Sequence, residues 1–288
     1  MIPTVTAKRA AFRQLHESGC FTIPNPWDIG SARYLQHLGF KAIATSSAGF
    51  AFSRGLPDNA VPRDVMLAHI RELVDATDIP VNADFENGFA LGIEELAENV
   101  RLCVETGVCG LSIEDSTGDK AKPLYELDHA VERIKAARVA IDRAGGNVIL
   151  VGRAECFLVG QDDIAEIVRR LQAYAKAGAD CLYAPGIGTR EQITAVVTAV
   201  APKPVNVLIS GPGGLTIAEV AALGVRRVSV GGALARVAWG EFIRAAKELV
   251  SQGTFGGFAE AVPHGELNEL FRVEEQQRRA AGRPKLDG

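Results

Sequence analysis

The sequence lacks the features that define several classes of protein. Within its 288 residues, no run approaches the ~20 uninterrupted apolar residues that a membrane-spanning helix needs. The N-terminal residues 1–13 are not followed by the apolar segment of a secretory signal. The five cysteines are scattered and form no CxxC pair, the spacing typical of zinc sites and redox motifs. We therefore expect a cytoplasmic protein whose thiols are reduced and mostly buried.

An excess of positive charge is also missing. The 31 lysines and arginines are outnumbered by 35 acidic residues, which gives a formal net charge of −4 and no basic face for nucleic acid. Neither GxGxxG nor GxxxxGK(S/T), the glycine-rich loops that cradle nucleotide phosphates, occurs in the sequence. We expect a small-molecule partner, and neither nucleic acid nor a membrane. The five histidines fall on predicted helices and are interpreted as structural or surface residues.

Short apolar runs alternate with longer amphipathic stretches, the pattern of repeated βα units around a parallel sheet. Several amphipathic stretches end at a glycine, where a helix is expected to stop. The predicted strands are 20–24, 42–46, 80–84, 110–114, 148–153, 181–185, 204–208 and 225–230. Eight strands, each followed by a helical stretch, favour a (β/α)8 barrel, the TIM-barrel fold, over an open sheet.

The C-terminal part of the sequence departs from the βα pattern. After the eighth predicted strand the pattern is largely helical, with further helices predicted at 255–260 and 267–281. We predict a single domain, residues 1–288, in which residues from about 241 to 288 form a helical extension of the barrel.

Three carboxylates follow the third and fourth predicted strands, where a barrel places its catalytic groups. Asp84 and Glu86 are two residues apart and share a face of an extended segment, and Glu114 ends the neighbouring strand about 4.8 Å away. Acids this close repel one another unless a cation or protons intervene. A hard cation, Mg²⁺ or alternatively Mn²⁺, suits such oxygen ligands. Two other interpretations stay open: capping and loop solvation, or a glycosidase-like pair of Glu86 and Glu114.

Two further sets of polar groups fall at predicted strand ends. Arg153 follows an apolar run and needs an anion to offset its desolvation. It pairs either with acids such as Glu155 or with a substrate carboxylate or phosphonate, which a guanidinium binds through two hydrogen bonds. Ser46 and Ser47 end the second strand, either as hydroxyl caps of a tight turn or as donors to a developing oxyanion.

Five segments follow one another at a specific spacing: Ser46-Ser47, Gly55-Leu56-Pro57-Asp58, Pro80-Val81-Asn82-Ala83-Asp84-Phe85-Glu86-Asn87-Gly88, Gly110-Leu111-Ser112-Ile113-Glu114-Asp115 and Gly152-Arg153. Together with Asn206 they resemble the isocitrate lyase / phosphoenolpyruvate mutase superfamily over roughly residues 11–241. The resemblance implies a modified barrel that assembles as a dimer of dimers, a homotetramer whose neighbours exchange a C-terminal helix. It also implies Mg²⁺-dependent cleavage or formation of C–C or P–C bonds next to a 2-oxo acid or its enolate.

The resemblance further implies roles for the charged residues of these segments. Asp84, Glu86 and Glu114 match the acids of the superfamily's metal shell, some of which act through water. Arg153 matches the arginine that binds the substrate anion. These implied roles agree with the positions of the same residues at predicted strand ends.

Four other positions match residues that surround the substrate in the superfamily. Ser46 and the N–H of Ser47 match the groups that hold the 2-oxo-carboxylate. Asp58 matches a mobile acid beside the site, and Asn206 matches an amide that contacts the substrate.

The loop after the fourth strand departs from the superfamily's lyases. Those that act on isocitrate or 2-methylisocitrate carry a general acid–base cysteine there, whereas residues 116–125 form a short segment without cysteine. The longer loop of the mutases is missing too. Pro185 replaces the acid after the sixth strand, and Ala44 replaces an aromatic residue before the serine pair. Without the cysteine, Lys120, Lys122 and Tyr125 are candidates to move a proton from a loop that closes over the site.

The sequence therefore supports the hypothesis of a Mg²⁺-dependent, lyase-like enzyme. It breaks or forms a C–C bond in a small 2-oxo or 2-hydroxy carboxylic acid through a metal-stabilised enolate, and Asp58, Lys120 and Arg153 are its predicted catalytic residues. Two alternatives stay open. One is P–C bond chemistry of the phosphonopyruvate hydrolase or phosphoenolpyruvate mutase type, and the other is an oxo-acid-binding barrel without turnover.

Overall fold

A computed structural model describes residues 2–282 of the chain. These residues fall into two compact units: residues 5–233 form the larger one, and residues 234–282 together with residues 2–4 form the smaller one. All eight strands and every residue of the predicted site belong to the larger unit. No helix within residues 2–282 is both long and apolar enough to cross a membrane.

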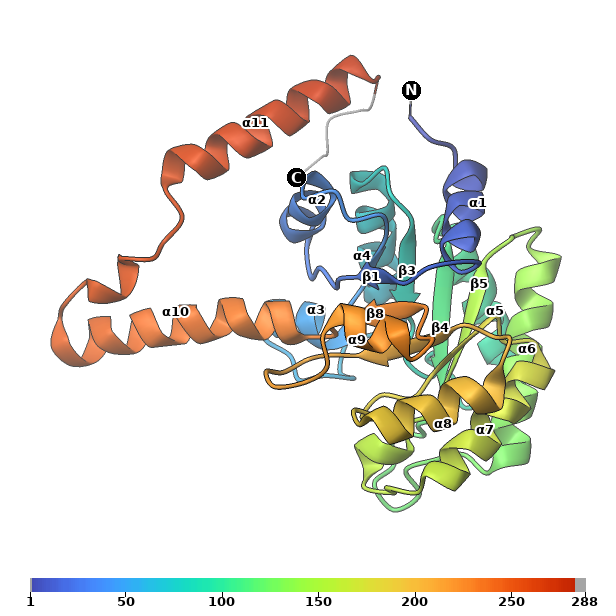
Figure 1. Cartoon of the computed structure of the whole chain (residues 1–288). Helices are drawn as coiled ribbons and strands as arrows, with labels where there is room; N and C mark the ends of the chain where they lie inside the picture. The colour runs from blue at the N-terminus through green and yellow to red at the C-terminus, as the bar shows by residue number, and fades with distance from the viewer. Residues whose placement is uncertain (1, 283–288) are drawn as a thin grey trace. The chain divides into compact units, whose positions relative to one another are not determined.

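Eight parallel strands form the centre of the larger unit (Figure 1). They pair in the order β1-β8-β7-β6-β5-β4-β3-β2. The two end strands meet where the N–H of Ala44 donates to the carbonyl of Pro24 at 3.0 Å, which brings the sheet round into a barrel. The bounds are β1 Phe21–Ile23, β2 Ile43–Ala44, β3 Val81–Asp84, β4 Gly110–Glu114, β5 Ile149–Arg153, β6 Cys181–Tyr183, β7 Val205–Leu208 and β8 Arg227–Ser229.

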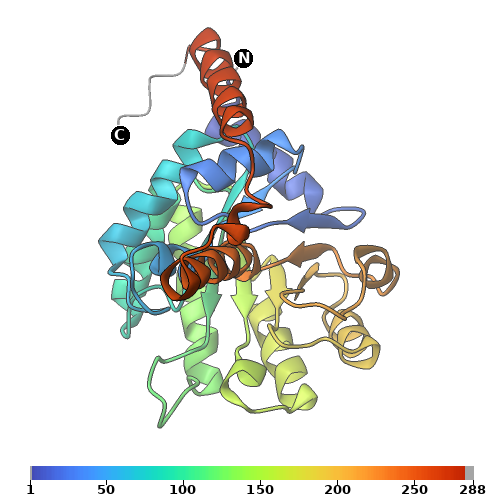
Figure 2. The ribbon, with the colours of Figure 1, turned by 90° about the vertical axis from the view of Figure 1, so that its left-hand side faces the viewer.

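Helices lie around the strands (Figure 2). Their bounds are α1 Val5–Leu15, α2 Ile29–His37, α3 Ser47–Ser53, α4 Arg63–Ala76, α5 Ile93–Glu105, α6 Leu127–Arg143, η1 Cys156–Val159, α7 Ile164–Ala177, α8 Arg190–Val200 and α9 Ile217–Ala222. Asp28 caps α2 by accepting the N–H of Ser31 at 2.7 Å, and Gly178 ends α7 with a φ of 110°.

The predicted fold class is confirmed, because the chain forms a (β/α)8 barrel and each observed strand lies within a predicted one. The sequence analysis did not single out α1, α3, α4 or α8. The segment interpreted as a capped turn begins α3, where Ser46 is the N-cap and its hydroxyl accepts the N–H of Gly49 at 3.1 Å.

Apolar side chains fill the barrel at the amino-terminal ends of its strands. Phe12 of α1 is fully buried there, in a cluster with Ile23 and Ile149. A Cβ at Gly110 would lie 2.8 Å from Cε1 of Phe12 and 2.6 Å from Oδ1 of Asn82. Glycine at this position therefore leaves room for both side chains, and Asn82 can point into the barrel.

The smaller unit is helical, as the sequence predicts for the C-terminal extension. It contains α10 Ala233–Gln252, η2 Gly256–Phe258 and α11 His264–Ala280. Among the residues of α10 only Ala235 is buried. Large apolar side chains of this unit are exposed, with Val250 at 85%, Val237 at 65% and Phe242 at 61%. Exposed apolar surface of this kind is typical of an interaction site.

Candidate active site

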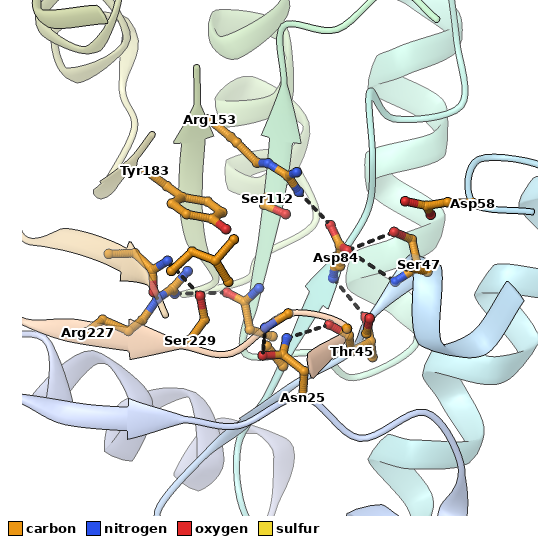
Figure 3. A pocket seen from close by; sticks show the side chains of 18 residues that line it. Asn25, Thr45, Ser47, Asp58, Asp84, Ser112, Arg153, Tyr183, Arg227 and Ser229 are labelled. Atoms are coloured by element: carbon orange, nitrogen blue, oxygen red, sulfur yellow. Dashed lines mark hydrogen bonds and ion pairs between the residues drawn. The ribbon is translucent and has the colours of Figure 1, made fainter. Parts of the chain in front are cut away.

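A cavity of about 150 Å³ opens at the carboxyl ends of the strands, where a barrel is expected to hold its site (Figure 3). Because side chains alternate along a strand, residues two apart face it together. Such pairs are Asn82 and Asp84 on β3, Asn206 and Leu208 on β7, and Arg227 and Ser229 on β8. The other polar residues of the lining are Asn25, Thr45, Ser46, Ser47, Asp58, Ser112, Arg153 and Tyr183.

Asp84 lies at the mouth of the cavity with Ser47 and Arg153, and these residues form its rim. Oδ2 of Asp84 accepts the backbone N–H and the hydroxyl of Ser47 at 3.1 and 3.0 Å, and its Oδ1 lies 3.2 Å from Nη1 of Arg153. The backbone N–H of Asp84 donates to the hydroxyl of Thr45 at 2.8 Å. The carboxylate is therefore fixed from the ends of β2, β3 and β5.

Arg153 is shared among three carboxylates. The nitrogen that faces Asp84 also lies 3.2 Å from Oε2 of Glu114, and Nε of the same guanidinium forms an ion pair with Glu155. Burial lowers the pKa of Arg153, but the charges of Glu155 and Glu114 outweigh burial and raise it well above its ordinary value. Arg153 thus pairs with the protein's own acids and also lines the cavity.

Glu86 lies in a turn after β3 whose backbone is strained. Its φ is 47°, in the left-handed region that costs a residue other than glycine about 1–3 kcal/mol. The side chain is buried, and its Oε1 has no hydrogen-bond partner. Burial, followed by the charges of Asp84 and Asp58, raises the pKa of Glu86 to about 8. Arg133 holds the turn by donating to three backbone carbonyls of residues 87–91.

More acids than arginines lie around the rim, because Asp84, Glu86 and Glu114 all interact with Arg153. Glu86 and Glu114 both interact with Asp84 and Arg153, and burial raises the pKa of Glu114 well above its ordinary value. A bound cation would favour the charged forms of these acids, and the orphaned Oε1 of Glu86 also fits such a cation.

Direct ligation of that cation would depend chiefly on Asp84. Within residues 2–282, no three His, Cys, Asp or Glu side chains gather closely enough to hold a metal ion by themselves. Mg²⁺ usually takes one or two carboxylates and keeps several waters. This coordination preference suits Asp84, the predicted ligand that lines the cavity. Glu86 and Glu114 lie outside the lining.

Amides and a second arginine form the floor of the cavity. Nε of Arg227 donates to Oδ1 of Asn206 at 2.8 Å, and its Nη1 donates to Oδ1 of Asn82 at 3.2 Å. Nδ2 of Asn206 donates to the hydroxyl of Ser229 at 2.9 Å. Because Asn82 precedes Asp84 by two residues on β3, the floor lies about 6.6 Å deeper in the barrel than the rim.

The structure brings most of the predicted residues to this cavity. Its lining includes Ser46, Ser47, Asp58, Asp84, Arg153 and Asn206. Glu86 and Glu114 belong to the charge network of the rim without lining the cavity. Lys120 is exposed on the loop after β4 and is not part of the lining.

Sequence reasoning missed several residues of the lining, among them Tyr183, Arg227 and Ser229. Burial raises the pKa of Tyr183 to about 12, so its phenol stays protonated at neutral pH. Arg227 had a signal in the sequence, because Arg226 and Arg227 are adjacent in an extended segment and one of them must point inward. Cys156 is buried outside the lining, and burial raises the pKa of its thiol to about 11.

A (β/α)8 barrel with carboxylates and an arginine at the carboxyl ends of its strands is the architecture of a barrel enzyme. The chain belongs to the phosphoenolpyruvate phosphomutase family, whose model matches residues 12–250. The resemblance to the isocitrate lyase / phosphoenolpyruvate mutase superfamily is thereby confirmed. A structure from Burkholderia cenocepacia J2315, described as a candidate lyase or mutase, is 50% identical, covers 93% of this chain and 97% of that chain, and has a TM-score of 0.90.

Among the other relatives, the named enzymes agree on the class of reaction. An uncharacterized protein of Mycobacterium tuberculosis is 33% identical over 224 residues, 77% of this chain and 81% of that protein. Oxaloacetate decarboxylase of Paraburkholderia xenovorans is 30% identical over 205 residues, 68% of this chain and 67% of that enzyme. The structure of an oxaloacetate acetylhydrolase in complex with the product oxalate is 25% identical, covers 97% and 99% of the two chains, and has a TM-score of 0.85. These relatives bear out the predicted class, an enzyme of the carbon–carbon lyase type.

Proposed function

We propose that the chain is a divalent-metal-dependent lyase that breaks or forms a C–C bond in a small 2-oxo or 2-hydroxy carboxylic acid. The observation that carries the proposal is the rim, where Asp84 is held beside Ser47 and Arg153 at the mouth of the cavity. The cavity of about 150 Å³ is smaller than the ~300–1,000 Å³ of pockets for drug-sized ligands, so it suits an acid of a few carbons.

The residues of the rim are proposed to bind the substrate's first carboxylate. Ser46, Ser47 and Arg153 all line the cavity next to Asp84. A carboxylate placed there would accept charge-assisted hydrogen bonds from the guanidinium and from N–H and O–H donors. The same donors would stabilise negative charge that develops on a substrate oxygen when the C–C bond breaks.

Proton transfer is proposed to depend on groups around the mouth. Asp58 lines the cavity beside Ser47 (Figure 3), within reach of a bound acid. Lys120 would act only when the loop of residues 116–125 folds over the mouth. Tyr183 already lies in the lining with a protonated phenol, so it is a third candidate donor.

Mg²⁺, with Mn²⁺ as the alternative, is the proposed cofactor. Asp84 would ligate it directly, and Glu86 and Glu114 would reach it through water. When bound, the cation supplies positive charge that polarises a substrate oxygen. Arg153 would hold Asp84 and Glu114 together across β3 and β4. Arg133 would hold the turn that carries Glu86.

The family match supports a second candidate function, P–C bond chemistry on phosphonopyruvate. The same rim would then bind a phosphonate through Arg153, which suits a guanidinium equally well. Release of phosphate from phosphonopyruvate would identify a hydrolase. Tight binding of oxo acids without any product would identify an oxo-acid-binding barrel without turnover.

The proposal includes self-association in the cytoplasm, as a dimer or tetramer. The support for it is the smaller unit, where Val237, Phe242 and Val250 expose more than half of their surface in the single chain. An apolar surface of this kind is commonly buried against a second subunit.

The test is a calorimetric titration of oxalate, an analogue of the pyruvate enolate, with and without Mg²⁺. We expect wild type to bind oxalate only with the metal. We expect the Asp84→Ala variant to bind it at least about 100-fold more weakly, because the ligand of the cation is lost. Metal-dependent binding would justify a screen of oxo, hydroxy and phosphono acids as substrates.

The matched control is Asp162→Ala, which removes an exposed aspartate outside the cavity and should bind oxalate like wild type. Binding that is equal with and without Mg²⁺ would contradict the metal site. Absence of binding under every condition would leave the resemblance as evidence of the barrel alone. Cleavage of aryl glycosides that survives a chelator would instead support the acid pair of Glu86 and Glu114.

A further inference from the structure

Arg227 is a buried cation that faces neutral groups. Arg227 is only 3% exposed, and its guanidinium donates to the amide oxygens of Asn206 and Asn82. Among the residues that the structure describes, no carboxylate forms an ion pair with Arg227. His16 and Cys181 are titratable groups that interact with its charge. The pKa of His16 is lowered to about 3 by burial and, second, by the charge of Arg227, and burial raises the pKa of the Cys181 thiol. The histidine is therefore neutral and supplies no counter-charge.

A guanidinium in this position has donors that the protein does not use. Arginine carries five N–H donors in a planar fork, and the bonds to Asn206 and Asn82 engage two of them. Arg227 also lines the cavity, so a bound molecule can reach the remaining donors. Removing a charged guanidinium from water is costly, and a paired anion offsets more of that cost than neutral amide oxygens do. The floor of the cavity therefore has the charge and the geometry of an anion site.

We infer that Arg227 binds a second anionic group of the substrate, at the opposite end from the carboxylate held at the rim. This inference rests on the proposed function, which places the first carboxylate beside Asp84. The rim and the floor are about 6.6 Å apart along the barrel. A single carboxylate group is too small to contact both. Figure 3 shows Arg227 and Asp84 on different sides of the cavity.

The inferred substrate class is a short 2-oxo or 2-hydroxy dicarboxylate. The lining of the cavity also includes Ala44 and Leu208, whose apolar side chains suit the carbon chain of such an acid. Asn206 and Asn82 hold the guanidinium from β7 and β3, so their part is to position Arg227. A monocarboxylate with a methyl group at the far end would leave Arg227 without a partner anion.

The experiment compares two ligands that differ at one end. Malate and 2-hydroxybutyrate are both four-carbon 2-hydroxy acids. They differ at the far end, where malate has a carboxylate and 2-hydroxybutyrate has a methyl group. In calorimetric titrations with Mg²⁺ present, we expect wild type to bind malate at least about tenfold more tightly. In Arg227→Met, which keeps much of the length and removes the charge, we expect the two affinities to become equal within about twofold. Oxalate, which needs only the rim, should bind this variant as it binds wild type.

Arg227→Lys and Arg71→Met complete the design. The lysine keeps a charge but not the fork, so it should retain part of the preference for malate. Arg71 is exposed on α4, and its replacement should change nothing. Oxalate binding by wild type without a preference for malate would overturn the inference and leave the proposed function standing. An equal loss of all three ligands in both Arg227 variants would assign the residue a purely structural role. Failure of wild type to bind oxalate at all would remove the proposed function and the inference together.

Discussion

The two arginines of the cavity show how differently one barrel holds the same type of residue. Arg153 at the rim faces three carboxylates, so the protein itself more than neutralises its charge. Arg227 in the floor faces two amide oxygens, so its charge is left for a ligand. The comparison indicates that Arg153 chiefly holds the acids of the rim together, whereas Arg227 chiefly attracts an anion.

A third buried arginine provides the structural reference. Arg133 is 1% exposed and donates to backbone carbonyls within residues 87–91, and its guanidinium lies 4.4 Å from the ring centroid of Tyr125. It lines no part of the cavity. Arg133 shows that carbonyls and an aromatic face can hold a guanidinium in the protein interior. What separates Arg227 from it is access to the cavity.

The largest effect is expected from removing the rim arginine. Arg153→Met leaves Asp84, Glu114 and Glu155 without their shared counter-charge, so we expect the free energy of unfolding to fall by about 3–5 kcal/mol. Mg²⁺ should restore part of this loss, since it binds the same acids. Urea denaturation with and without the metal measures both effects. Arg71→Met, on the exposed face of α4, should change stability by less than about 0.5 kcal/mol. A fully stable Arg153→Met would mean that the acids of the rim do not depend on the arginine.

A smaller effect, confined to stability, is expected from Arg133→Met. The carbonyls of the turn after β3 lose their donors, and we expect a loss of about 1–3 kcal/mol in the free energy of unfolding. The ratio of malate to 2-hydroxybutyrate affinity should stay as in wild type, because Arg133 does not reach the cavity. Urea denaturation and calorimetry on the same preparation provide the two values. A variant that lost the preference for malate would show that the Arg227 result is not specific to the floor.

The strands could be predicted because each is an apolar run bounded by polar residues and glycine, and the barrel follows from their number and their helical connections. Several helices could not. The segment Ser47–Ser53 of α3 contains small, aromatic and hydroxyl residues without a clear helical period, and α1 precedes the first strand, outside the repeated βα pattern. Their packing on the barrel, including the entry of Phe12 into its interior, is a tertiary effect.

The rim of the site could be predicted, and the floor could not. Asp84 and Arg153 are each the last residue of a strand, so their place at the mouth follows from the fold alone. Arg227 and Asn206 lie within strands, and a sequence does not show which side chains meet across a barrel. The predicted substrate amide, Asn206, proves to be bonded to Arg227 and Ser229, which are 21 and 23 residues away in the chain. Only the closed barrel brings these three together.

The smallest expected effect is a change in the pKa of His16, a buried residue that interacts with the charge of Arg227. Nδ1 of His16 donates one hydrogen bond, to the carbonyl of Phe12 at 2.8 Å. The pKa of His16, about 3, reflects burial first and the charge of Arg227 second. Arg13 lowers this pKa further and Asp180 raises it. Arg227→Met should therefore raise the pKa of His16 by a fraction of a unit and leave it well below 6.5, because burial remains. An NMR titration of the histidine rings measures the shift.

The same change has a predictable sign for stability. Between pH 6.5 and about 3, the unfolded chain binds a proton at His16 that the folded chain does not, so the free energy of unfolding falls as the pH falls. A higher folded pKa in Arg227→Met makes that fall smaller, by less than about 1 kcal/mol at pH 4. His69, with a pKa lowered to about 4 chiefly by burial and no contribution from Arg227, is the internal control and should titrate alike in both proteins. An unchanged His16 titration would mean that Arg227 already has an anion beside it in the resting protein, and the contrast between the two arginines would then disappear.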